Sequence, residues 1–198
     1  ILEAGCAWAP EAIFDPDTRD YVVYWATISP RDGVTRARIY YARTADFRTF
    51  STPQEYIDRP GDRAIIDTQI IPIRDPEAPF AYVRASADGQ ITFEGADSIL
   101  GTWTVLGDIS HVGLTNAEVE GPFLFRFNGT DRYALYVDQH GSGGGYLPLT
   151  TTHPWSPRTF QLVPPSEYEL GGSLKRHGSI LNLSAEELAR VRAAWGDG

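Results

Sequence analysis

The chain has 198 residues, of which 42% are hydrophobic and 22% are charged, a composition typical of a folded domain and not of a disordered chain. Its net charge of -9 argues against nucleic-acid binding, which needs clustered lysine and arginine, whereas a neutral sugar is compatible with it. No run of ~18 apolar residues is present, which excludes a membrane-spanning helix, and the single cysteine, Cys6, excludes an internal disulfide.

Short strands separated by turns are predicted along most of the chain. The runs richest in β-branched and aromatic residues are 21–27, 38–42, 80–85, 90–94, 123–127 and 132–138. Asp88-Gly89 and Asn128-Gly129 lie between consecutive runs and predict tight hairpins. Only residues 184–195 are predicted to form a helix, with Ser184 as its N-cap.

A coarse repeat sets the expected architecture. An aromatic-rich strand follows a turn near residues 21, 80 and 132, and each repeat has room for four strands. This spacing favours a β-propeller, whose blades are four-stranded sheets of roughly 40–50 residues. A β-sandwich also uses short strands separated by turns and is the alternative. On the propeller interpretation, residues 1–198 form a single all-β domain with about four blades.

Four short motifs follow one another along the chain. They are Trp8-Ala9-Pro10-Glu11, Ile66-Asp67, Glu120-Gly121-Pro122 and His177-Gly178-Ser179. Their order and context resemble the family 43 glycoside hydrolases, five-bladed propellers that act on arabinose- and xylose-containing glycans. The resemblance covers about residues 5–185. It implies inverting hydrolysis of α-L-arabinofuranosyl or β-xylosyl bonds in plant cell-wall polysaccharide.

Two carboxylates are the predicted catalytic groups. Glycoside hydrolysis needs an acid that protonates the leaving oxygen, and an inverting enzyme also needs a carboxylate, roughly 6.5–9.5 Å away, that activates water. Glu120, at a strand edge before Gly-Pro, is the predicted acid, and Glu118 is its competitor because it points to the same strand face. The resemblance implies that Asp67 orients the acid and raises its pKa; a hydrogen-bonded turn aspartate is the alternative.

The general base is not found. The resemblance implies an aspartate of the first blade, upstream of Trp8, but Glu3 is the sole carboxylate before Trp8. We therefore expect the domain to be N-terminally incomplete and the base to lie upstream of Ile1. Asp15 and Asp75 are poor substitutes because each fits a turn. An incomplete or non-catalytic propeller that binds carbohydrate without cleaving it is the alternative function.

The remaining expectations concern contacts with the oligosaccharide or polysaccharide substrate. Trp8 is predicted to stack on a sugar face, or else to be a core tryptophan. Glu11 and Arg176 are expected to bind sugar hydroxyls, or else to form ion pairs. His177 is expected to line the central channel. The resemblance places a calcium ion or its waters near such a histidine, although calcium prefers oxygen ligands and a core histidine is the alternative. No cofactor is otherwise expected.

Other kinds of site are excluded or rank lower. The glycine-rich segment 139–146 lacks the lysine of a P-loop and fits a rim loop. A serine-nucleophile elbow is missing, and one cysteine with four scattered histidines excludes a structural zinc site. Arg74-Asp75-Pro76 is similar to a triplet of family 32 fructosidases, but Gly121 stands where that family usually has cysteine. Sequons at Asn128 and Asn182 give weak support to the extracellular location that we expect.

Overall fold

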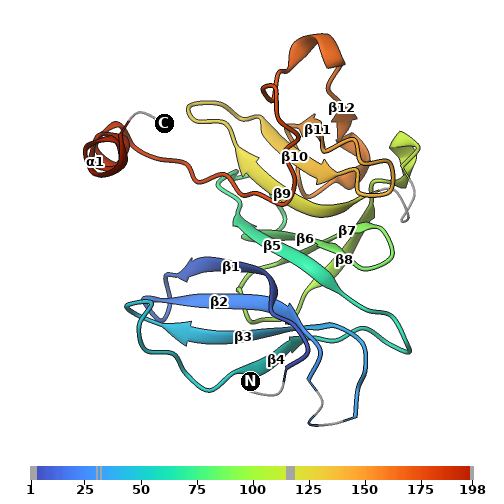
Figure 1. Cartoon of the computed structure of the whole chain (residues 1–198), viewed down its shortest axis with the longest axis vertical. Helices are drawn as coiled ribbons and strands as arrows, with labels where there is room; N and C mark the ends of the chain where they lie inside the picture. Colours follow the sequence, from blue (N-terminus) through green and yellow to red (C-terminus); the bar gives the residue numbers. More distant parts are fainter. Residues whose placement is uncertain (1–3, 30, 32, 115–118, 197–198) are drawn as a thin grey trace.

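A computed structural model of the chain describes residues 4–29, 31, 33–114 and 119–196. Within these ranges, three four-stranded antiparallel sheets follow one another in chain order (Figure 1). The first sheet contains β1 (Trp8–Asp15), β2 (Asp20–Thr27), β3 (Arg38–Thr44) and β4 (Gln54–Ile57). The second contains β5 (Ile66–Pro72), β6 (Tyr82–Ala87), β7 (Ile91–Ala96) and β8 (Thr104–Asp108). The third contains β9 (Glu120–Arg126), β10 (Tyr133–Asp138), β11 (Tyr146–Thr151) and β12 (Gln161–Leu162).

The two predicted hairpins are confirmed. Ala87 pairs with Ile91 around Asp88-Gly89, and Arg126 pairs with Tyr133 around Asn128-Gly129. Each turn supplies a glycine with a positive φ, which lets a short connection match the twist of the strands beside it. The turn residues therefore set where the strands of the second and third sheets pair.

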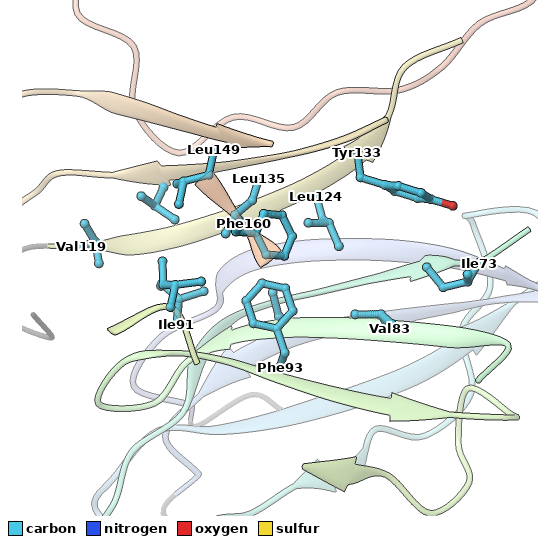
Figure 2. Packing of buried hydrophobic residues seen from close by; sticks show 13 residues of the cluster. Ile73, Val83, Ile91, Phe93, Val119, Leu124, Tyr133, Leu135, Leu149 and Phe160 are labelled. Carbon is cyan, nitrogen blue, oxygen red and sulfur yellow. The ribbon is translucent and has the colours of Figure 1, made fainter. Parts of the chain in front are cut away.

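The sheets pack face to face, and β5 contacts β1 on one side and β9 on the other. Figure 2 shows the core between the second and third sheets, where Phe93 and Val83 face Leu124, Leu135 and Phe160. The rings of Phe93 and Phe160 lie 5.2 Å apart between centroids. A second buried cluster joins the first sheet to the second. Burial of apolar side chains between neighbouring sheets thus fixes their relative positions.

This stacking confirms the predicted β-propeller class. The repeat length predicted about four blades, and the described residues form three four-stranded sheets. After β12 the chain runs past the third sheet, where Asn182 Nδ2 donates a hydrogen bond of 2.7 Å to the backbone oxygen of Arg126. The predicted helix is confirmed as α1 (Ala185–Trp195), which stands apart from the sheets in Figure 1. Ser184 and Glu187 form its reciprocal capping box. In the part of the chain described, no helix is long and apolar enough to cross a membrane.

Candidate active site

The strands β1, β5 and β9 share a backbone irregularity near their first residues. In each, one extra residue is accommodated opposite the neighbouring strand, which is a β-bulge. Ala9, Asp67 and Gly121 lie in these bulges with φ values of 43°, 50° and 53°. His177, in the segment that follows the third sheet, has a φ of 43°. The left-handed region is uncommon for residues other than glycine, so the fold imposes this conformation at Ala9, Asp67 and His177.

These four positions surround one pocket of about 320 Å³. Its walls are residues 9–11, 67–69, 121–122 and 177–179. The four predicted motifs, which are far apart in the sequence, therefore meet around one cavity of a size that suits a small ligand such as a sugar residue.

Asp67 lies in the wall of this pocket and is only 6% exposed. Its Oδ2 accepts a hydrogen bond of 3.0 Å from the backbone N–H of Gly121. Burial raises the pKa of Asp67, and the nearby charges of Glu120 and Asp138 act in the same direction; the His177 charge and the Gly121 hydrogen bond oppose the rise. Asp67 is thus a buried carboxyl group whose proton is held more tightly than usual.

Glu120 is the first residue of β9, and its side chain is 23% exposed. Its Oε1 lies 3.0 Å from His177 Nε2 and 3.4 Å from Arg176 Nη2, and its Oε2 lies 3.8 Å from His140 Nδ1. A carboxylate oxygen of Asp67, a carboxylate oxygen of Glu120 and a ring nitrogen of His177 all lie within 4.8 Å of one another. The structure therefore brings the two predicted carboxyl groups together beside the pocket.

Asp138 belongs to the same cluster and was missed by the sequence analysis. It ends β10, pairs in register with Glu120, and is fully buried. Its Oδ2 lies 2.8 Å from Arg176 Nε and 3.2 Å from His177 Nε2. The sequence feature that could have indicated Asp138 is an aspartate at the end of an apolar strand. However, if the strands paired residue by residue from the Asn128-Gly129 hairpin, Gln139 would lie opposite Glu120. The bulge of β9 shifts the register by one residue and selects Asp138 instead.

The other predicted binding residues divide into two groups. Glu11 and His177 line the pocket, and Arg176 contacts Glu120 beside it. Burial raises the pKa of Glu11, while a hydrogen bond with Ser179 opposes the rise. Trp8 is 53% exposed and is not part of the pocket wall, so it is neither a core residue nor in contact with the cavity.

The residues weighed as alternative carboxylates lie elsewhere. Asp15 binds Arg43 at 2.9 Å at the turn between β1 and β2. Asp75 accepts a hydrogen bond of 2.9 Å from the backbone N–H of Glu77 in the connection between β5 and β6. Both are therefore turn residues, as the sequence suggested. Glu118 and Glu3 fall outside the described residues.

The cluster of Asp67, Glu120 and His177 supplies two of the oxygen ligands that calcium prefers and one nitrogen. Nε2 of His177 lies within hydrogen-bonding distance of an oxygen of Glu120 and of an oxygen of Asp138, and a proton on this nitrogen in those hydrogen bonds would prevent it from binding a metal. Calcium takes about six to eight oxygen ligands, so waters or carbonyl groups would have to supply those that Asp67 and Glu120 do not.

Comparison with known proteins agrees with this geometry. Over residues 2–189 the chain matches a family model related to glycosyl hydrolase family 43 and described as "Probable glycosyl hydrolase domain". No curated protein matches the chain. Similar solved structures include a thermostable family 43 glycoside hydrolase, with 15% identity and a TM-score of 0.56, covering 87% of this chain and 60% of that one.

Two further structures share the fold. The catalytic domain of a family 62 α-L-arabinofuranosidase from Coprinopsis cinerea has 15% identity and a TM-score of 0.55, covering 80% of this chain and 50% of that one. An exo-β-1,3-galactanase from Phanerochaete chrysosporium with β-1,3-galactotriose has 16% identity and a TM-score of 0.53, covering 80% and 36%. At these identities the likeness concerns the fold. This chain spans 36% to 60% of the length of the three proteins.

The family match covers most of the chain, and the motifs that carried the resemblance to family 43 converge on one pocket of a propeller-type fold. The chain belongs to the glycosyl hydrolase domain family related to glycoside hydrolase family 43.

Proposed function

We propose that this domain serves the inverting hydrolysis of α-L-arabinofuranosyl or β-xylosyl bonds in plant cell-wall polysaccharide. The observation that carries the proposal is the approach of Asp67 and Glu120 beside the pocket, where their nearest ligand atoms lie within 4.8 Å. Two carboxyl groups with different environments are the usual equipment for glycoside hydrolysis.

Glu120 is the proposed general acid. Oε1 is held by Arg176 and His177, whereas among the described residues Oε2 has only the long contact with His140 and is the oxygen suited to carry the proton. As the glycosidic bond breaks, this proton passes to the leaving oxygen, and a water molecule, deprotonated by a base, attacks the anomeric carbon. Asp67 is too buried and too close to Glu120 to activate that water, because an inverting pair is separated by roughly 6.5–9.5 Å.

Asp67 is instead proposed to support the acid. A negative charge beside a carboxyl group helps that group to keep its proton at neutral pH. Burial and the Gly121 hydrogen bond hold Asp67 in place for this role. We assign no general base within the described residues; the base is proposed to come from a segment preceding Ile1 in a longer protein.

The test is turnover of aryl glycosides by a longer protein that includes the segment carrying the base, and by the Glu120→Gln variant of that protein. Loss of the general acid should lower kcat by about 100- to 10,000-fold. Glu167→Gln is the control, because Glu167 is an exposed glutamate in the 3-10 turn after β12, and it should keep the wild-type rate. An unchanged rate for Glu120→Gln would overturn the assignment of the acid. NMR of the first-formed sugar anomer should show inversion; a retained anomer would contradict the inverting mechanism.

The substrate class is decided by a panel of nitrophenyl α-L-arabinofuranoside, β-xyloside and β-galactoside. The galactoside belongs in the panel because a structure with the same fold is an exo-β-1,3-galactanase. A faster rate on the galactoside than on the two pentosides would overturn the proposed substrate.

A binding module that does not cleave is the second candidate. It is favoured by the failure to assign a base among residues 4–29, 31, 33–114 and 119–196. Sugar binding in calorimetry without turnover of any glycoside would support this candidate over hydrolysis.

A further inference from the structure

The buried carboxyl group of Asp138 lies against the side chains of Arg176 and His177. Oδ2 takes both contacts, with Arg176 Nε at 2.8 Å and His177 Nε2 at 3.2 Å. Oδ1 is buried and has no hydrogen-bond partner in the described part of the chain. A buried carboxylate without a partner is strongly destabilising, so these two contacts hold Asp138 and the two cations together.

The same two side chains hold Glu120. His177 Nε2 lies almost midway between Glu120 Oε1 and Asp138 Oδ2, at 3.0 Å and 3.2 Å. Arg176 spans the same gap, with Nη2 3.4 Å from Glu120 and Nε 2.8 Å from Asp138. Both side chains are substantially exposed and belong to no described strand. The buried carboxylate behind them is therefore one of the contacts that fix their positions.

We propose that Asp138 is a positioning residue for Glu120 that acts through Arg176 and His177; this inference rests on the proposed function. Asp138 contacts Nε of Arg176 and Nε2 of His177, which prevents both side chains from turning fully toward Glu120. Oε1 of Glu120 is then held at a fixed place, and Oε2 stays available to the leaving oxygen. Since Asp138 is fully buried, it does not touch substrate itself.

The kinetic test compares substrates that need an acid with substrates that do not. A dinitrophenyl glycoside departs without protonation, whereas a glycoside with a poor leaving group requires the general acid. Asp138→Asn keeps the size of the side chain and removes its charge. We expect it to lose up to about 100-fold in kcat on the poor leaving group and little on the dinitrophenyl glycoside, because a displaced catalytic group can lower the rate by that factor. Glu120→Gln should show the same pattern more strongly.

A control and a second variant keep this test decisive. Asp15→Asn removes another buried strand-end aspartate that binds an arginine, far from the pocket, and should leave both rates unchanged. His177→Gln interrupts the same link at a half-exposed site and should reproduce the leaving-group pattern. An equal loss on both substrates for Asp138→Asn and His177→Gln would show a purely structural role and overturn the proposal.

An NMR measurement separates this inference from the activity. In protein labelled with ¹⁵N-histidine, long-range ¹H–¹⁵N spectra report which ring nitrogen carries the proton, and His177→Gln assigns the His177 signals. We expect Nε2 to be protonated in the wild type, and we expect the His177 signals to change in Asp138→Asn but not in Asp15→Asn. Unchanged signals in Asp138→Asn would overturn the link, whereas a longer protein that includes the segment before Ile1 and still cleaves no glycoside would refute only the proposed function.

Discussion

Replacement of Gly121 by alanine should damage the site through one added methyl group. Gly121 has a φ of 53°, and a Cβ placed there would lie 3.1 Å from Cε1 and 3.2 Å from Nδ1 and Nε2 of His177. Carbon atoms prefer contacts of about 3.5–4.0 Å, so the imidazole would have to move by a few tenths of an ångström. That movement would disturb the 3.0 Å contact between His177 and Glu120.

Gly129→Ala is the matched control for this variant. Gly129 also has a positive φ, of 72°, but a Cβ there would meet no heavy atom within 4 Å. The free energy of unfolding of both variants should be lower by roughly 1–2 kcal/mol, because alanine is strained in the left-handed region. For a chain of this length, each kcal/mol lowers the Tm by about 2–4 °C. Only Gly121→Ala should show a further loss of stability, altered His177 signals in NMR and slower glycoside hydrolysis.

Differential scanning calorimetry and the rates on a nitrophenyl glycoside provide the comparison. If the two variants have the same Tm, and Gly121→Ala keeps wild-type His177 signals, then contact between the two residues does not govern the geometry of the cluster.

Two further predictions concern the pH dependence of stability. Burial raises the pKa of Asp67 above its ordinary 3.8, so the native state releases that proton later than the unfolded chain, and stability falls as pH rises from 3.8 through the native pKa. In denaturation experiments at several pH values, the free energy of unfolding of Asp67→Asn should therefore rise relative to that of the wild type as pH rises through this range. A relative free energy that falls with rising pH would contradict this prediction. Burial alone would raise the pKa of Glu94 as well, but hydrogen bonds and charges from Arg59 and Arg84 lower it to about 2. The stabilisation from Glu94 is thus present above pH 4.5 and lost as pH falls through about 2. The difference in free energy of unfolding between the wild type and Glu94→Gln should therefore become smaller as pH falls between these values. A difference that stays constant would count against the ion pairs.

Local chemistry allowed much of the fold to be predicted from the sequence. Asp88-Gly89 and Asn128-Gly129 can adopt the positive φ of short hairpins, and Ser184 can cap a helix, so these elements depend on neighbours in the chain. The number of complete sheets was harder to predict, because the repeat length does not reveal that the chain leaves the third sheet after β12.

The site was predictable only where a motif carried it. Glu120 and Asp67 stand in recognisable motifs, and the fold brings them together. Asp138 faces Glu120 because a bulge shifts the pairing of β9 and β10 by one residue, and no local pattern in the sequence announces that shift. The exposed position of Trp8 likewise depends on how the first sheet packs, which the Trp-Ala-Pro motif does not encode.

Ala9, Asp67, Gly121 and His177 share one backbone conformation around the pocket but carry a methyl group, a carboxylate, a hydrogen atom and an imidazole. The backbone thus has the same conformation at each of these positions, and the side chain can differ from one position to the next. Single substitutions at these positions can therefore change which sugar a protein of this architecture binds, or remove its hydrolytic activity. The sheets behind the pocket keep their hydrogen bonds in either case.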